Sequence, residues 1–408
     1  MMEPSNDFQT LMQRWTALAP YNAIDLIRLP GKLDGARWRE AIVQPMKDLG
    51  FPAPDYIGAI YPEFMLGTNW ELNKPFADGD VPLRFFLIEE EESHYFGVTF
   101  DHWIADSPSF RFLTHRAFEN YMAPGTASKL PPLQICQKSF DSLFYKSSWL
   151  MTAVESLKEY FRHIHAYRIP ISEPLEFDSS FQHIRLPDGL IGHIYQFAKK
   201  MDATVNDVFL AVLLQTMGDY TSAARSEQRS RLFRPKRDDV AFSTAVDIRP
   251  LANESLEDQF GCWISYFSVV VKNPEQISMP DLTRQIAAYT KSVKAGRKAL
   301  RFFQGFKMCL MFWDHLKDPR QKALMMNRAL PFAGGISNVN LTDTWIGRDE
   351  RIMDYIRISP TGPLIPAVFT LSTIRDRLSL CFTHHHGVFR PDQAVAIAAD
   401  FVRRLTAL

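Results

Sequence analysis

Several features that mark specialised classes of protein are scarce or absent. The chain has four cysteines, Cys136, Cys262, Cys309 and Cys381, with no Cys-x-x-Cys pair, so neither a zinc site nor a redox motif is indicated. No run approaches the roughly 18 apolar residues of a membrane helix, and the acidic first ten residues contain no apolar signal-peptide core. We therefore expect a cytoplasmic protein with reduced cysteines, no bound metal and no transmembrane segment.

An excess of charge of either sign is also absent, because 46 Lys and Arg balance 46 Asp and Glu. No global field would attract nucleic acid, so we expect no nucleic-acid partner and only local charge recognition. The chain shows no internal repeat and no low-complexity segment, which excludes solenoids. What it does have is 408 residues, 46% of them hydrophobic, which is enough for two domains with apolar cores.

Helical and strand patterns alternate in both halves of the sequence. Residues 34–49 have apolar positions at helical spacing, and residues 82–88 and 94–100 are apolar, β-rich runs joined by an acidic turn. Residues 279–311 have the pattern of one long helix, and residues 352–359 that of a strand. The pattern predicts an α/β fold. A proline-containing stretch after Arg168 predicts a boundary between residues 1–170 and 171–408.

The most informative segment follows the second apolar run. It reads Thr99-Phe100-Asp101-His102-Trp103-Ile104-Ala105-Asp106-Ser107. The run is apolar on both faces, which indicates a buried strand whose end delivers His102 into the interior. A buried imidazole is costly unless it is hydrogen-bonded or functional, so His102 is either a satisfied core residue or a group that does chemistry.

The sequence motifs elsewhere in the chain favour a catalytic role for His102. The segment resembles the His-His-x-x-x-Asp-Gly signature of the CoA-dependent acyltransferase superfamily, which includes chloramphenicol acetyltransferase, the condensation domains of nonribosomal peptide synthetases, plant acyltransferases of the BAHD type and wax ester synthases. Further landmarks of that superfamily appear in order across residues 20–405: Pro82-Leu83-Arg84, Thr204-Val205-Asn206-Asp207, Val246-Asp247-Ile248-Arg249-Pro250 before Phe260-Gly261, and Ile336-Ser337-Asn338-Val339.

The resemblance implies two similar lobes, each a mixed sheet flanked by helices, with an active-site tunnel between them. His102 would act as general base on an acceptor hydroxyl or amine that attacks a thioester, without an acyl-enzyme. Asp106 would pair with Arg249 and hold the loop in shape rather than orient the base. Ser337 and Asn338 are candidates for stabilising the oxyanion or lining the tunnel, with a structural role in the strand as the alternative.

Two positions depart from the signature. Asp101 stands where the first His is usual, and beside His102 we expect it to raise the pKa of the imidazole. Ser107 stands where Gly is usual, and its side chain is expected to narrow the tunnel or to change which acceptor fits.

Two other clusters have a structural and a functional interpretation. Lys294, Arg297, Lys298 and Arg301 would share one helical face, which is either a solvated basic face or a contact for donor phosphates or an acidic carrier protein. The aromatic and Met-rich stretch from Phe302 to Trp313 either packs a core or lines an acyl pocket. Three consecutive histidines, 384–386, point to alternating faces of a strand and cannot easily converge on one metal ion.

The sequence thus predicts a free-standing acyltransferase. It would use acyl-CoA or a phosphopantetheine thioester as donor substrate, bind no cofactor, and accept a small metabolite or a lipid, with an acyl or peptidyl carrier protein as a further candidate partner. The alternatives are an amide-forming, condensation-like enzyme and a non-catalytic binding or docking module of the same fold. A hydrolase is a third alternative, although the chain has no Gly-x-Ser-x-Gly nucleophile elbow.

Overall fold

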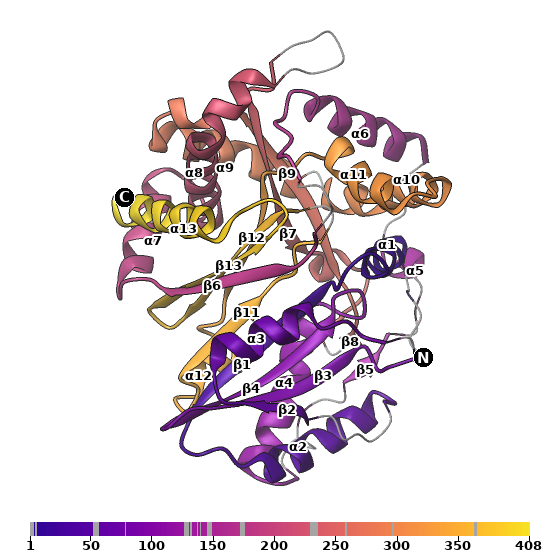
Figure 1. The fold of residues 1–408 in the computed structure, drawn as a ribbon, viewed down its shortest axis with the longest axis vertical. Helices are drawn as coiled ribbons and strands as arrows, with labels where there is room; N and C mark the ends of the chain where they lie inside the picture. The colour runs from indigo at the N-terminus through magenta and orange to yellow at the C-terminus, as the bar shows by residue number, and fades with distance from the viewer. Residues whose placement is uncertain are drawn as a thin grey trace. The chain divides into compact units, whose positions relative to one another are not determined.

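A computed structural model shows a mixed α/β protein with two main sheets flanked by helices (Figure 1). It describes residues 4, 6–51, 57–77, 79–125, 130, 133–136, 138, 140–144, 149–171, 176–228, 236–257, 259–295, 298–362 and 365–408. The chain forms two compact units. The first comprises residues 1–146, 247–264 and 340–360, and the second comprises 147–246, 265–339 and 361–408. Residue 170, the boundary predicted from the sequence, falls within the second unit.

The first unit is built on a five-stranded sheet with the order β11-β1-β4-β3-β2. The strands are antiparallel except for the parallel pair β2 and β3. Their bounds are β1 (Asn22–Pro30), β2 (Ile57–Tyr61), β3 (Leu83–Glu89), β4 (Ser93–Asp101) and β11 (Asp354–Ile358). The helices of this unit are α1 (Asp7–Thr16), α2 (Gly35–Asp48), α3 (Phe64–Asn73), α4 (Ser107–Met122), α5 (Phe140–Leu143) and α12 (Trp345–Arg348), with short strands β5 (Gln134–Ile135) and β8 (Gln259–Phe260) and the 3-10 helix η2 (Arg249–Leu251).

Strand β4 is central in this sheet, between β1 and β3, and all nine of its residues are buried. Aromatic stacking fixes helices α2 and α4 to it: the Trp38 ring of α2 lies 3.9 Å from that of Phe96 on β4 and 4.0 Å from that of Tyr121 on α4, nearly parallel to both. The continuous apolar pattern of residues 94–100 therefore predicted both the strand and its burial. Rigid packing here fixes the point at which the chain leaves β4.

The second unit contains a six-stranded sheet with the order β6-β13-β12-β10-β7-β9. Its strands are β6 (Ser179–Arg185), β7 (Asp239–Asp247), β9 (Ile264–Lys272), β10 (Gly334–Asn340), β12 (Ala367–Ile374) and β13 (Arg377–His385). Its helices are α6 (Trp149–Arg162), α7 (Leu190–Lys200), α8 (Val205–Glu227), α9 (Met279–Ala295), α10 (Lys298–His315), α11 (Pro319–Ala329) and α13 (Pro391–Thr406), with the 3-10 helix η3 (Pro274–Gln276).

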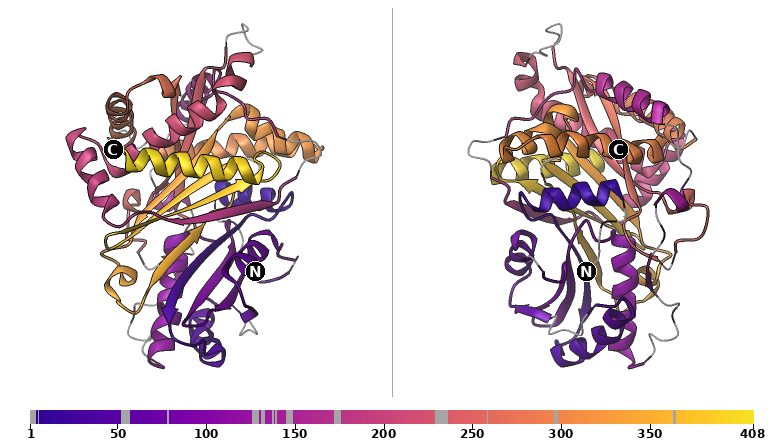
Figure 2. Two further views of the ribbon diagram at one scale, coloured as in Figure 1. Left: turned by 60° about the vertical axis from the view of Figure 1, so that its left-hand side comes forward. Right: turned by 90° about the vertical axis from the view of Figure 1, so that its right-hand side faces the viewer.

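Helices cover both faces of this sheet (Figures 1 and 2). Phe242 and Phe369 point to the face where α7, α8, α9 and α13 build the main apolar core. Ser243, the next residue on β7, points to the opposite face, toward α6, α10 and α11. Helix α8 begins at a capping box in which Thr204 and Asp207 satisfy each other's backbone N–H groups, as the Thr-Val-Asn-Asp sequence indicates.

Two sequence predictions are corrected by the structure. The long helix predicted over residues 279–311 is two helices, α9 and α10. The strand predicted at residues 352–359 is β11, which belongs to the sheet of the first unit rather than to that of the second. Within the described part of the chain, no helix is long and apolar enough to cross a bilayer.

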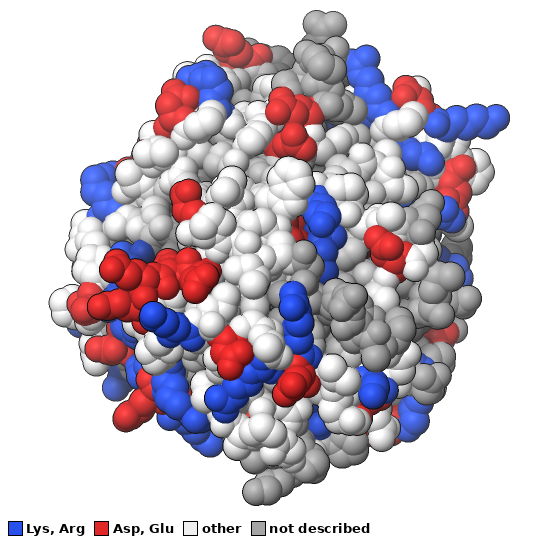
Figure 3. All heavy atoms as spheres, turned by 60° about the horizontal axis from the view of Figure 1, so that its bottom comes forward, with Lys and Arg blue, Asp and Glu red and all other residues white. Residues whose placement is uncertain are grey.

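The surface shows the charge balance of the sequence. Basic and acidic side chains are interspersed on the face seen in Figure 3. This face therefore presents no large field of one sign, and charge recognition depends on local groups.

Candidate functional site

His102 follows the last residue of β4 and is 3% exposed. Its backbone N–H donates to the carbonyl oxygen of Tyr21 at 3.1 Å, which ties it to the residue before β1. Its ring is stacked on that of Tyr21, with the ring centres 5.9 Å apart, and meets the ring of Phe100 edge-on at the same distance. The imidazole is therefore held in one orientation by two aromatic neighbours.

Burial makes the imidazole a neutral group. Burial, the largest cause, and the positive charge of Arg357 together lower the pKa of His102 to about 4, against smaller opposing contributions from the backbone of His102 and Ala105 and from the Asp106 carboxylate. Asp101, which the sequence suggested would raise this pKa, is not among the main groups that shift it, and the net shift is downward. Burial raises the pKa of Asp101 itself to about 7, and its carboxyl accepts a hydrogen bond from the Thr16 hydroxyl at 2.9 Å.

One ring nitrogen of His102 lacks a hydrogen-bond partner in the described structure. This is Nδ1, which is buried and makes no hydrogen bond of normal geometry, although the backbone of His102 and of Ala105 lies close enough to raise the pKa of the ring. A buried polar atom without a partner costs free energy, so this nitrogen has the capacity to bond to a ligand or a water molecule. No described acidic side chain contacts the ring at hydrogen-bond distance, so the site is not a His-Asp dyad.

Asp106 instead binds Arg249. The two terminal guanidinium nitrogens each donate to a different carboxylate oxygen, both at 2.8 Å. The carboxylate is 1% exposed, and it also accepts from the backbone N–H of Trp263 at 2.8 Å and of Ser109 at 3.1 Å. Burial raises the pKa of Asp106, but Arg249 and these N–H groups more than offset it, so the net shift is downward.

The same carboxylate caps the N-terminus of helix α4. Asp106 is its N-cap residue, and its own backbone N–H donates to the carbonyl oxygen of Gly261 at 3.1 Å. Arg249 and the Phe260-Gly261 segment of the sequence landmarks thus meet the histidine motif at this one residue, the first through its side chain and the second through its backbone. Asp106 orders the loop after His102, and the first unit supplies every group involved.

Ser107 does not open onto free space. It is fully buried, and its hydroxyl donates to Asp25 on β1 at 3.4 Å. Asp25 pairs directly with Arg357 across β1 and β11. Burial raises the pKa of Asp25, and Arg357 and Arg111 oppose that rise.

Sequence reasoning missed this cluster of Asp25, Arg357 and Ser107. A signal was present, because an aspartate in the middle of the apolar strand Asn22–Pro30 requires a buried partner. The partner lies far along the sequence, so spacing gives no indication of its identity. Through Arg357 the cluster lowers the pKa of His102.

The remaining predicted residues belong to the second unit. Ser337 and Asn338 lie on β10, the first half-buried and the second exposed. Lys294 and Lys298 are on different helices, α9 and α10, so the single basic helical face is a wrong prediction. Arg297 and the side chain of Arg301 lie outside the described residues.

The three consecutive histidines do not form a metal centre. Among the described residues no group of three or more His, Cys, Asp or Glu side chains could hold a metal ion. His386 contacts the hydroxyl of Ser180 at 2.6 Å through Nε2, and its Nδ1 lies 3.8 Å from the Glu176 carboxylate.

Comparison with known proteins gives one clear result. No family model matches the sequence, and no curated protein matches it significantly. Among solved structures, the trichothecene 15-O-acetyltransferase TRI3 from Fusarium sporotrichioides is similar, with a TM-score of 0.72 and 10% identity over 100% of this chain and 94% of that one. The condensation domain from the monacolin K polyketide synthase MokA gives a TM-score of 0.66 and 12% identity over 98% and 96% of the two chains.

A further condensation domain and an X-domain also match. The first condensation domain of the calcium-dependent antibiotic synthetase, in complex with a substrate analogue, gives a TM-score of 0.64 at 14% identity over 99% of this chain and 95% of that one. The X-domain from teicoplanin biosynthesis gives 0.59 at 15% identity over 100% and 95%. The chain therefore has the fold that these condensation domains, this X-domain and this acetyltransferase share. The resemblance drawn from the sequence is confirmed at the level of the fold.

Proposed function

We propose that the protein is an acyltransferase that moves an acyl group from a thioester to a hydroxyl or amine, with His102 as general base. The observation that carries the proposal is the state of His102: a neutral imidazole fixed at the end of a buried strand, with the motif carboxylate of Asp106 committed to Arg249. A general base must be unprotonated when the acceptor arrives, and a histidine whose pKa is about 4 meets this condition at neutral pH.

The proposed step balances without a covalent acyl-enzyme. His102 takes the proton of the acceptor hydroxyl or amine as its oxygen or nitrogen forms a bond to the thioester carbonyl carbon. The tetrahedral intermediate then collapses, the carbon–sulfur bond breaks, and the thiolate receives the proton from His102. The donor is acyl-CoA or a carrier-bound phosphopantetheine thioester, and no resident cofactor is required.

A second candidate function is a non-catalytic docking module of the same fold. It is favoured by the very low exposure of His102 and by Ser107 in place of the glycine of the signature. One of the similar structures is an X-domain described in complex with OxyB. An amide-forming condensation reaction remains the alternative within the enzyme class, since the proposed base serves an amine as well as a hydroxyl.

Thiol release separates these functions. Acyl-CoAs and acyl-pantetheines of graded chain length would be mixed with alcohol and amine acceptors, and free thiol would be measured for the wild type and His102→Gln. The variant His315→Gln, which changes an exposed histidine on α10, is the matched control. We expect acceptor-dependent release by the wild type and the control, reduced by about 10² to 10⁴ in His102→Gln.

Product analysis distinguishes ester from amide. Release that is independent of acceptor and yields free acid would indicate a hydrolase. A correctly folded wild type that is inert with CoA, pantetheine and carrier-bound donors alike would reject the acyltransferase in favour of the docking module.

A further inference from the structure

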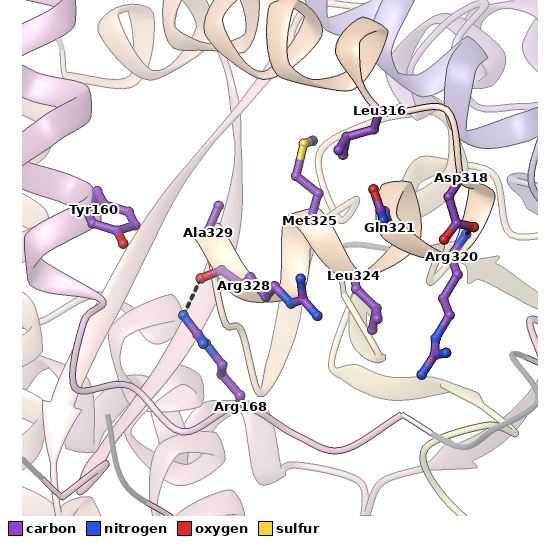
Figure 4. A pocket seen from close by; sticks show the side chains of 10 residues that line it. All are labelled: Tyr160, Arg168, Leu316, Asp318, Arg320, Gln321, Leu324, Met325, Arg328 and Ala329. Atoms are coloured by element: carbon purple, nitrogen blue, oxygen red, sulfur yellow. Dashed lines mark hydrogen bonds between the residues drawn. The ribbon is translucent and has the colours of Figure 1, made fainter. Parts of the chain in front are cut away.

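Two adjacent hollows in the second unit differ sharply in chemistry. The larger, of about 660 Å³, lies along α11 and the segment that follows α6 (Figure 4). The smaller, of about 190 Å³, lies among α6, α10, α11 and the sheet strands β7 and β9. Tyr160 and Ala329 line both, so the two hollows are neighbours that meet at these residues. None of their lining residues belongs to the unit that contains His102.

The larger hollow is basic. Arg168, Arg320 and Arg328 line it, against the single acidic side chain of Asp318. Arg168 donates to the carbonyl oxygen of Arg328 at 2.7 Å, which holds the first arginine against the end of α11 (Figure 4). The Asp318 carboxylate already accepts from the backbone N–H of Arg320 at 2.9 Å, as the N-cap of α11.

The smaller hollow is mainly apolar. Its lining includes Tyr266, Phe306, Met308, Phe312, Leu330 and Phe332. Phe306, Met308 and Phe312 belong to the aromatic and Met-rich stretch for which the sequence left an acyl pocket and core packing open. An apolar cavity of about 150 Å³ holds benzene, so about 190 Å³ accommodates a chain of roughly six to eight carbons.

Helix α6 lies between this hollow and an exposed apolar surface. It turns polar residues inward, with Ser156 and Glu159 lining the hollow. Its apolar residues face outward and are between 44% and 64% exposed: Leu150, Met151, Val154, Leu157 and Phe161. Exposed apolar surface of this extent on one helix is unusual in a globular protein and indicates an interaction with another protein, a membrane or an apolar ligand.

We propose that the two hollows together bind a single-chain anionic amphiphile, with its aliphatic chain among Phe306, Met308 and Phe312 and its anionic head at Arg320 and Arg328. The head group is a carboxylate or a phosphate, since guanidinium groups bind both in the same way. This site is distinct in its residues from the proposed catalytic site and does not depend on acyl transfer.

The test uses the full chain and four eight-carbon probes: octanoate, octyl phosphate, octan-1-ol and octylammonium. Binding is measured by calorimetry. A second readout is alkylation of Cys309, which lines the smaller hollow and whose pKa burial raises to about 11, followed by peptide mass spectrometry at alkaline pH. We expect octanoate or octyl phosphate to bind and to slow alkylation of Cys309, octan-1-ol to bind at least tenfold more weakly, and octylammonium not to bind.

Variants separate the two parts of the site. Arg320→Ala combined with Arg328→Ala is expected to weaken binding of the anionic probe at least tenfold, because both residues are exposed and their loss should not affect folding. Lys307→Ala is the matched control, since it removes an equal type of charge from α10 without lining either hollow. Cys309→Phe fills the chain site and should abolish binding, while Cys309→Ser should not.

The outcomes are decisive without any assay of turnover. Binding by octanoate but not octyl phosphate, or the reverse, supports the site and identifies the head group. Absence of binding and of Cys309 protection with all four probes would overturn the proposal. Equal binding of octylammonium and octanoate, or equal weakening by Lys307→Ala and the Arg320/Arg328 double variant, would overturn it as well.

Discussion

Removing the guanidinium of Arg249 should destabilise the first unit strongly. Arg249→Ala leaves the Asp106 carboxylate, 1% exposed, without its two charge-assisted hydrogen bonds of 2.8 Å. Breaking a buried ion pair in this way costs about 3–5 kcal/mol. For a cooperative unit of roughly 150 to 250 residues, each kcal/mol lowers the Tm by about 2–4 °C, so we expect a decrease of about 6–20 °C.

Calorimetric unfolding provides the assay, with the transition of each unit followed separately if two are resolved. Asp247→Ala is the matched control, because Asp247 also contacts Arg249, at 3.4 Å, but its side chain is 46% exposed. Because Asp247 is well exposed, its contact with Arg249 should contribute no more than about 1 kcal/mol, so this control should lose little.

The neutral double variant Asp106→Asn/Arg249→Gln tests the physical cause. If the cost arises from an uncompensated buried charge, the double variant should be more stable than Arg249→Ala. A Tm for Arg249→Ala within 2 °C of the wild type, or a double variant less stable than the single one, would refute the reasoning.

Three further predictions concern the loop around His102. If His102 is the base, kcat/KM should stay level as pH falls toward 4 and then decline, because the neutral imidazole is lost only there. A decline centred near pH 6.5 would contradict a pKa of His102 lowered by burial. The pKa of Asp101 rises to about 7 on folding, so the stability that its protonated carboxyl contributes is present below pH 3.8 and lost as pH rises through 7. The free energy of unfolding of Asp101→Asn, measured in urea, should therefore increase by up to about 4 kcal/mol relative to that of the wild type between pH 4 and pH 8. If the two proteins differ in stability by the same amount at pH 4 and at pH 8, this cause is excluded. Ser107→Gly should lower the free energy of unfolding by no more than about 1 kcal/mol and change the rate of acyl transfer less than about twofold, because the Ser107 hydroxyl is buried against Asp25. A tenfold gain in turnover would show instead that Ser107 obstructs the acceptor.

The local part of the site could be predicted from the sequence. Residues 94–100 do not alternate between apolar and polar side chains, which is typical of a strand buried on both faces. His102 directly follows the end of this strand at Asp101. The capping residues Thr204 and Asp207 located the start of α8 because their hydrogen bonds span three residues. Such features depend on neighbours in the chain, and pattern analysis detects them.

Features that depend on distant partners were not predictable in the same way. The counter-charge of Asp25 is Arg357, and only the register of β1 against β11 shows this. The division of residues 279–315 into α9 and α10 was missed because apolar periodicity continues on both sides of the break. Periodicity likewise describes the stripes of α6 without showing that the polar stripe faces inward, since that depends on what packs against the helix.

The pairing of β1 with β11 also affects how the protein is made. Leu26 pairs with Ile356, which is 330 positions further along the chain. At 5–20 residues per second, a ribosome needs roughly 15–65 s to reach it. During that time β1 lacks its neighbour on one side, and an apolar strand with open backbone groups invites pairing with other chains. The strand that closes this edge also brings Arg357 to Asp25, so until late in synthesis the buried carboxylate on β1 has Arg111 but not Arg357 to oppose its raised pKa.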